Sequence, residues 1–181
     1  MYSPLLEKAF RMALEGHASQ KRKGEETPYI THPVGVALIL ARYGFEEEVI
    51  AAGLAHDLVE DTTYTEEDLR EELGDTVTDI VMSVTNSATL PWKDKKEAYI
   101  ESVKEGSVGA KAVSVADKVH NAESLIARYR DIGTRLWSDF NASREDKLWF
   151  EEAMLSMLKE TWSHPLVDEY EALVTEMRTL V

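Results

Sequence analysis

Two adjacent residues, His56 and Asp57, directly follow an apolar segment of the chain. Residues 49–55 are apolar throughout, which predicts a central buried helix over about residues 46–59. A carboxylate buried there without a partner would be costly, so it needs an ion pair or a metal ion. The stretch 46–79 holds thirteen acidic residues and a single base, Arg70. The sequence therefore favours a metal ion as the partner of this pair.

Two more residues of ligand type lie elsewhere in the chain. His32 precedes a proline at the start of a predicted helix, and Asp117 follows an apolar run in a later one. Taken singly, His32 is typical of a helix cap, and Asp117 of an ion pair with Lys118 or Arg128. Together with His56 and Asp57 they form a nitrogen and oxygen set that suits Mn²⁺, Fe²⁺ or Zn²⁺ better than Ca²⁺. Such an ion lowers the pKa of a water molecule that it binds.

A second pair of carboxylates, Glu60 and Asp61, comes one helical turn after His56 and Asp57. Residues four apart lie on nearly the same face of a helix. Carboxylates beside an activated water are candidates for positioning it and for taking its proton. The alternative is structural, with Asp61 and Thr62 capping the helix or the loop that follows.

The elements that must position these side chains are predicted to be helices. Apolar residues recur with helical period, Gly and Pro are few, and no strand-like alternation persists. Ser3-Pro4 is a typical helix start, and Gly44 a typical stop. We expect one all-α domain over residues 1–181, a bundle of eight to nine helices, with the helices of residues 143–181 packed on it. The other predicted helices cover about 5–14, 33–43, 46–59, 65–73, 76–85, 93–104 and 110–130, and residues 20–27 form a basic loop.

Composition narrows the class of protein further. The 181 residues carry 20 Lys and Arg against 34 Asp and Glu, a net charge of −14, which disfavours nucleic acid and anionic lipid as partners. The absence of cysteine excludes disulfides, thiol nucleophiles and thiolate zinc sites. No apolar run is long enough to cross a membrane, and the N-terminus has no signal-peptide pattern, so we expect a cytoplasmic protein. The oligomeric state stays open, and an oligomer is compatible with the sequence.

Three motifs together resemble a known family. They are Pro28-Tyr29-Ile30-Thr31-His32-Pro33, His56-Asp57-Leu58-Val59-Glu60-Asp61-Thr62 and Ala116-Asp117-Lys118 with Asn121. The chain resembles the HD superfamily of metal-dependent phosphohydrolases, whose motif is H…HD…D. It is most similar to the hydrolase domain of RelA/SpoT proteins and to the small stand-alone alarmone hydrolases of the metazoan SpoT-homologue type. This resemblance is strongest over residues 5–130.

The resemblance implies an enzyme that hydrolyses the 3′-pyrophosphate of ppGpp or pppGpp with Mn²⁺, giving GDP or GTP and pyrophosphate. Another divalent metal ion would fit the same ligands. It implies His32, His56, Asp57 and Asp117 as metal ligands. It implies Glu60 and Asp61 as the residues that activate the attacking water, and Arg22, Lys23 and Asn121 as substrate-binding residues.

Two alternatives remain open at this point. The same site could act on another nucleotide, such as an adenosine alarmone, the 2′-phosphate of NADPH or a different phosphoester. A non-catalytic nucleotide-binding HD domain is the second alternative. The loop from Arg22 to His32 is one residue longer than the family's usual spacing. Beyond residue 130, Arg144 and Lys147 are expected on a solvated helix face, with the lining of a phosphate pocket as the alternative.

Overall fold

The regular structure of the protein is helical. The computed structural model describes residues 3–87, 89–140 and 142–180. Within these residues the only β-type pairing is an isolated bridge between Lys21 and Pro28. The helices are α1 (Pro4–Gly16), α2 (Thr31–Arg42), α3 (Glu47–Ala55), α4 (Leu58–Asp61), α5 (Glu66–Leu73), α6 (Asp75–Val84), α7 (Trp92–Glu105), α8 (Val108–Ile132), the 3₁₀ helix η1 (Gly133–Asp139), α9 (Arg144–Thr161) and α10 (Pro165–Met177).

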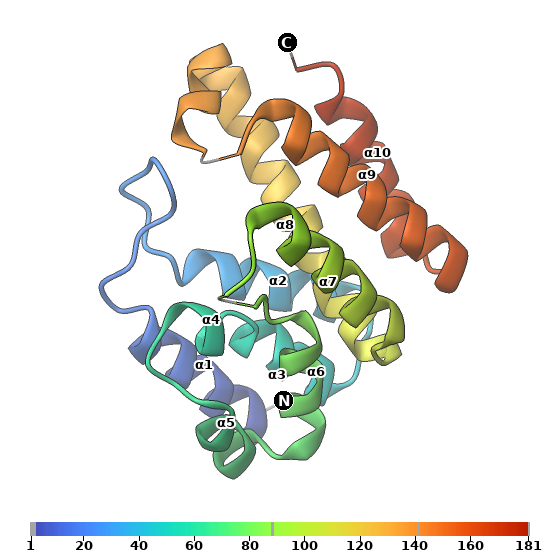
Figure 1. Cartoon of the computed structure of the whole chain (residues 1–181). Helices are drawn as coiled ribbons and strands as arrows, with labels where there is room; N and C mark the ends of the chain where they lie inside the picture. The colour runs from blue at the N-terminus through green and yellow to red at the C-terminus, as the bar shows by residue number, and fades with distance from the viewer. Residues whose placement is uncertain (1–2, 88, 141, 181) are drawn as a thin grey trace.

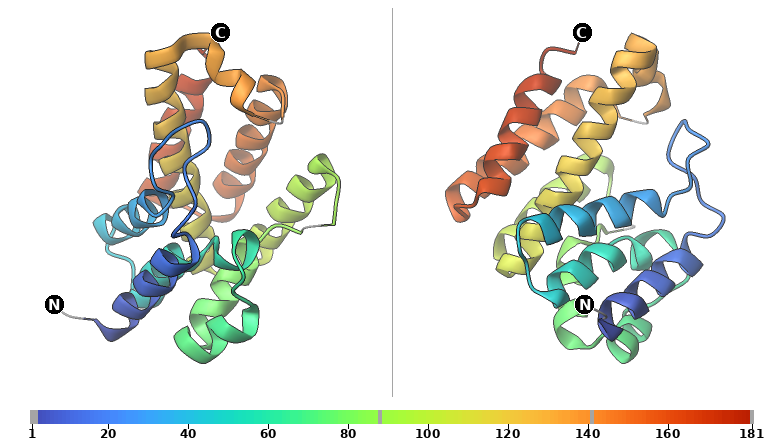
Figure 2. Two further views of the ribbon diagram at one scale, coloured as in Figure 1. Left: turned by 90° about the vertical axis from the view of Figure 1, so that its left-hand side faces the viewer. Right: turned by 180° about the vertical axis from the view of Figure 1, so that it is seen from behind.

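The long helix α8 connects the two halves of the molecule (Figure 1). Its first half contacts α2, α3 and α6, and its buried residues there are mostly small, such as Ala110, Ala112 and Ala116. Its second half packs with η1 and α10 around a smaller apolar cluster that includes Leu125, Ile126 and Met177. The views from the side and from behind show α9 and α10 next to each other, on the far side of α8 from α1 (Figure 2).

Local sequence signals explain where many helices begin. Ser3, Ser107 and Ser143 each accept a hydrogen bond from a backbone N–H of the first turn of α1, α8 and α9, respectively. Thr65 and Asp68 form a reciprocal capping box at the start of α5. Because these signals depend only on nearby residues, most predicted helix boundaries agree with the structure within a few residues.

The predicted helix over residues 46–59 is interrupted at the two candidate metal ligands that it contains. Helix α3 ends at Ala55 and α4 begins at Leu58, so His56 and Asp57 form a turn between them. Asp57 leaves ideal helical geometry, with φ −97° and ψ −1°. If α3 and α4 are counted as one interrupted helix, the described residues hold nine α-helices, as expected. The short helix η1 was not predicted, since its seven residues carry no periodic apolar stripe.

The middle of α3 is buried on all sides, as its apolar composition predicts. Ala51, Ala52 and Ala55 have no exposed surface. A Cβ atom on Gly53 would lie 2.5 Å from the Cδ1 atom of Leu40, so glycine at this position allows α2 to approach α3. This close approach brings the first turn of α2, which carries His32, next to the end of α3. No helix within the described residues is both long and apolar enough to cross a lipid bilayer.

Candidate metal centre and substrate cleft

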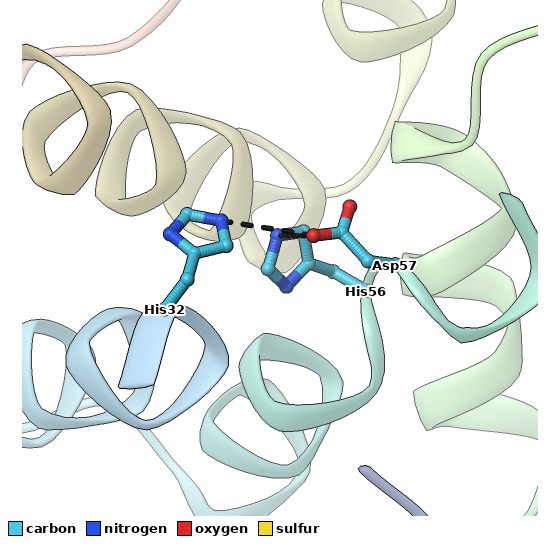
Figure 3. A group of neighbouring side chains, drawn as sticks. All are labelled: His32, His56 and Asp57. Carbon is cyan, nitrogen blue, oxygen red and sulfur yellow. Dashed lines mark ion pairs between the residues drawn. The ribbon is translucent and has the colours of Figure 1, made fainter. Parts of the chain in front are cut away.

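Three side chains converge at the junction of α2, α3 and α4 (Figure 3). His32 extends from the first turn of α2, and His56 and Asp57 come from the turn that follows α3. The Oδ2 atom of Asp57 lies 3.2 Å from Nε2 of His56 and 3.7 Å from Nε2 of His32. One ligand atom from each of the three residues lies within 4.8 Å of the others, which is a suitable spacing for a shared cation.

The fourth predicted ligand, Asp117, approaches from α8. Its Oδ1 atom lies 3.1 Å from Nε2 of His32 and 3.9 Å from Nε2 of His56. Both histidines therefore direct Nε2 toward the two carboxylates. The fold brings together all four residues of the expected ligand set, although they lie up to 85 positions apart (117 − 32) in the chain.

The hydrogen bonding of His56 favours a metal cation among these four side chains. Its Nδ1 atom lies 2.8 Å from the backbone oxygen of Gly53, which can only accept, so Nδ1 carries the hydrogen. Its Nε2 atom is buried and has no hydrogen-bond partner within the described residues. A buried ring nitrogen that faces carboxylate oxygens, and that offers its lone pair once a cation displaces its proton, matches the mixed donor set of a transition-metal site. The residues present therefore fit a divalent ion.

Electrostatics in this cluster also favour a cation. Burial by itself opposes charge on His56, but the carboxylates of Asp57 and Asp117 outweigh it and raise the pKa of His56 to about 9. Burial likewise opposes ionisation of both aspartates, yet the histidines, and for Asp117 the ammonium of Lys118, hold their pKa values below the usual range. Without a metal ion, a proton on His56 thus supplies positive charge where a cation would bind.

Binding of Mn²⁺ is therefore expected to displace a proton from His56. Between pH 7 and 9, the measured affinity for Mn²⁺ should rise about tenfold per pH unit, and it should level off above pH 9. Calorimetric titration in buffers of different ionisation enthalpy measures both the affinity and the protons released. An affinity that is constant over this range would contradict the assignment of His56 as a ligand.

Several side chains hold the aspartates in place. Tyr29 donates from its hydroxyl to Oδ2 of Asp57 at 2.6 Å, and burial together with Asp57 raises the pKa of Tyr29. Lys118 contacts Oδ2 of Asp117 at 2.7 Å, and the amide of Asn121 donates to Oδ1 of the same carboxylate. These hydrogen bonds orient the carboxylates toward the histidines.

Replacing Lys118 by methionine is expected to destabilise the metal-free protein by about 3–5 kcal/mol, because it removes the ammonium group that pairs with the buried carboxylate of Asp117. Urea denaturation measures this change in the free energy of unfolding. The exposed pair of Lys104 and Glu101 provides a control, since Lys104→Met should cost less than about 1 kcal/mol. Equal effects of the two substitutions would mean that the Lys118 pair does not stabilise the fold.

The predicted catalytic carboxylates lie next to this cluster. Glu60 is held by Asn86, whose backbone and side-chain nitrogens lie 3.0 and 2.9 Å from its Oε2 atom. The backbone oxygen of Asp61 accepts a hydrogen bond from Gln20 at 2.6 Å. Burial, then the charges of Asp57 and Glu60, raise the pKa of Asp61 to about 6. A carboxylate with such a pKa is suited to accept a proton near neutral pH.

Glu60 and Asp61 form one end of a cleft of about 560 Å³. Four lysines line it, Lys23, Lys96, Lys118 and Lys147, together with Asn121 and the rings of Trp92, Phe140 and Phe150. Burial, and then repulsion from Lys118, lower the pKa of Lys96 to about 8. In a protein of net charge −14, this cleft is a place where a polyanion can bind.

Of the predicted substrate-binding residues, Lys23 and Asn121 line this cleft, and Arg22 lies beside Asn121. Arg22 and Lys23 are carried by the loop between α1 and α2, which is fastened to α8 because Arg128 donates to the backbone oxygens of Lys23 and Gly24. Arg22 donates to the side chain of Asn121 at 2.8 Å. Arg22, Lys23 and Asn121 therefore lie together, and they also line an adjoining pocket of about 280 Å³.

Sequence reasoning missed part of this cleft. Lys147 lines it instead of a solvated face, whereas Arg144 points away and donates to the backbone oxygen of Leu180. Lys96, Trp92 and Phe140 were not singled out. The run of Lys93, Lys95 and Lys96 in an otherwise acidic chain is the signal that could have identified this wall.

The helical fold and the gathered histidine and aspartate side chains define a class of all-α proteins with a histidine–aspartate centre. The model of the HD domain family matches residues 9–147, and the chain belongs to this family.

Proteins with a described activity are similar to this chain in sequence or in structure. The guanosine-3′,5′-bis(diphosphate) 3′-pyrophosphohydrolase MESH1 of Xenopus tropicalis is 42% identical over 124 residues, which cover 67% of this chain and 69% of that protein. The protein of the same name from Danio rerio is 44% identical over 116 residues, 62% of this chain and 64% of its own length. A solved structure described as a metazoan ortholog of SpoT that hydrolyses ppGpp has a TM-score of 0.83 at 27% identity, covering 100% of this chain and 99% of that one.

Proposed function

We propose that this protein hydrolyses the 3′-pyrophosphate of ppGpp and pppGpp, releasing pyrophosphate and leaving GDP or GTP. One observation carries this proposal: four ligand-type side chains converge beside a cleft whose walls bear four lysines. The named activities of the relatives support the choice of substrate. The proposed substrate is an intracellular nucleotide, so we also place the enzyme in the cytoplasm. We propose a single domain in which α9 lines the cleft and α10 packs behind it on α8 and α9.

The residues that would hold the metal ion are His32, His56, Asp57 and Asp117. A bound Mn²⁺ or similar divalent ion would supply Lewis acidity and lower the pKa of water at this point. The carboxylates of Glu60 and Asp61 lie beside the cluster, at the rim of the cleft. Asp61 is suited to hold the attacking water and to take its proton, because the pKa of Asp61 is about 6.

The lysines of the cleft give this acidic protein a means to bind a substrate with four or five phosphates. They come from the loop before α2 and from α7, α8 and α9, so they surround the cleft from different directions. Arg22 and Lys23 can contact phosphates, and Arg22 can also stack on a base. Attack of water on the phosphorus next to the ribose forms a new P–O bond and breaks the bond to O3′, so the water oxygen leaves with the pyrophosphate and the 3′-oxygen takes up a proton to become a hydroxyl.

Product analysis tests this function directly. The protein with Mn²⁺ is incubated separately with ppGpp, with its adenosine analogue and with NADPH, and an Asp57→Asn variant serves as the control. GDP and pyrophosphate from ppGpp, absent with the variant, are the expected result. Turnover of only NADPH or only the adenosine compound would show that ppGpp is not the substrate, and the assignment of the metal and catalytic residues would still stand. Metal binding without turnover of any of them would favour a nucleotide-binding module.

A further inference from the structure

A further histidine, His120, contacts the candidate ligand His32 on the side away from the aspartates. The Nδ1 atoms of the two rings lie 2.9 Å apart, and the ring centroids are 4.8 Å apart. Nε2 of His32 is the atom that faces Asp57 and Asp117. His32 therefore has a neighbour at each of its ring nitrogens, and neither carboxylate reaches the Nδ1 side.

The contact between two Nδ1 atoms accommodates one hydrogen. Two N–H groups at this distance would repel each other, and two lone pairs would leave both nitrogens without a partner. A neutral His32 that offers the lone pair of Nε2 to a cation must carry its hydrogen on Nδ1. Nδ1 of His120 is then the acceptor, and the hydrogen of the His120 ring must reside on Nε2.

We propose that His120 is a positioning residue for the metal centre, whose Nδ1 accepts the hydrogen of His32 and so fixes the tautomer and orientation in which His32 presents Nε2. This inference rests on the metal centre of the proposed function. The other histidine ligand has an equivalent partner, since the hydrogen of His56 Nδ1 goes to the backbone oxygen of Gly53. Each imidazole thus has an acceptor behind it.

The fold provides room for this contact through Gly35 in α2. A Cβ atom on Gly35 would overlap the Cδ2 and Nε2 atoms of the His120 ring. Glycine at this position therefore lets α8 place an imidazole against the first turn of α2. A side chain as small as alanine would have to displace the ring, and with it the hydrogen bond to His32.

Affinity for Mn²⁺, measured by titration of the metal-free protein at pH 7.5, is the first test. His120→Phe keeps a ring but has no acceptor, and it is expected to bind Mn²⁺ about 10–100-fold more weakly than wild type. His120→Asn places an amide oxygen as many bonds from the backbone as Nδ1, so its affinity should stay within about threefold of wild type. Gly35→Ala should reproduce the loss, since it moves the ring without changing any hydrogen-bonding atom.

A matched control is the same substitution at another histidine. His164 is the N-cap residue of α10 and contacts Tyr43, Phe45 and Trp162, away from the ligand cluster, so His164→Phe should leave the affinity for Mn²⁺ unchanged. Thermal unfolding of each metal-free variant shows that the fold is retained. Nitrogen-15 NMR of the zinc-loaded wild type gives an independent readout, in which His120 is expected as the Nε2–H tautomer.

The results separate this inference from the function on which it rests. If wild type binds Mn²⁺ and His120→Phe binds it equally well, the positioning role is wrong and the metal centre stands. Equal losses in His120→Phe and His120→Asn, or an Nδ1–H tautomer of His120 in the zinc-loaded protein, would also overturn it. If wild type itself does not bind Mn²⁺, the proposed metal centre fails and this inference fails with it.

Discussion

Replacing Asp57 by asparagine is expected to abolish Mn²⁺ binding at micromolar metal and to lower the rate of ppGpp hydrolysis by about 1,000-fold or more. The Oδ2 atom of Asp57 lies within 3.7 Å of Nε2 of both histidines, so it is central to the candidate ligand set. Asparagine has the same size and can still accept the hydrogen bond from Tyr29. The substitution therefore removes charge with little change in packing.

Titration with Mn²⁺ and steady-state kinetics measure the two effects on the same preparation. Asp131→Asn is a suitable control, because Asp131 is an exposed aspartate of α8, and it should leave both quantities unchanged. Retention of Mn²⁺-dependent activity by Asp57→Asn would show that the metal ion is held elsewhere. It would then remove the basis for assigning His32, His56 and Asp117 as ligands.

Replacing Asp61 by asparagine is expected to lower kcat by about 10²–10⁴-fold while the affinity for Mn²⁺ stays close to that of wild type. Asp61 lies at the rim of the cleft, and its backbone is held by Gln20, so the side chain can face the attacking water. Asparagine cannot take a proton from that water. The effect should therefore fall on kcat and not on metal binding.

The pH dependence of kcat gives a second readout for Asp61. Its pKa is raised to about 6 mainly by burial, and a bound cation would lower it again. At saturating Mn²⁺, wild-type activity should thus be complete at neutral pH and fall as the pH drops below 6, because the protonated carboxyl cannot act as a base. The Asp61→Asn variant should lack this acidic limb.

Two further substitutions make this test specific. Glu60→Gln shows whether the neighbouring carboxylate, anchored by Asn86, has a comparable role. Glu67→Gln removes an exposed negative charge on α5 and should leave kcat unchanged. If Asp61→Asn weakens Mn²⁺ binding as much as it lowers kcat, then Asp61 is a ligand and not a base.

Local signals in the sequence were sufficient to predict the α-helices, apart from the break between α3 and α4. A serine or threonine cap, a proline at the first helical position and a recurring apolar stripe each act over a few residues, so they do not depend on the rest of the fold. The ligand candidates could be predicted for a related reason. A histidine and an aspartate after an apolar run are costly to bury without a partner, and this cost is visible in the sequence alone.

The arrangement around these residues depends on contacts between distant segments. The turn at His56 and Asp57 interrupts a stretch whose composition predicts a continuous helix. Lys118 was a candidate partner of Asp117 from the sequence, but the partners Tyr29 and His120 become identifiable only when α2, α3 and α8 are packed together. Sequence spacing carries no information about which of many polar residues will meet across helices.

The lysine-lined cleft shows most clearly what the sequence alone does not reveal. Lys96 and Lys147 lie on α7 and α9, and each resembles an ordinary solvated lysine in its own helix. Packing of α7 against both α8 and α9 directs the two side chains into one cleft with Lys23 and Lys118. Helical period and composition therefore account for the helices of this protein and for the types of residue that could bind a metal ion. The binding surface arises from long-range packing, because charges on separate helices act together only after the core has brought them close.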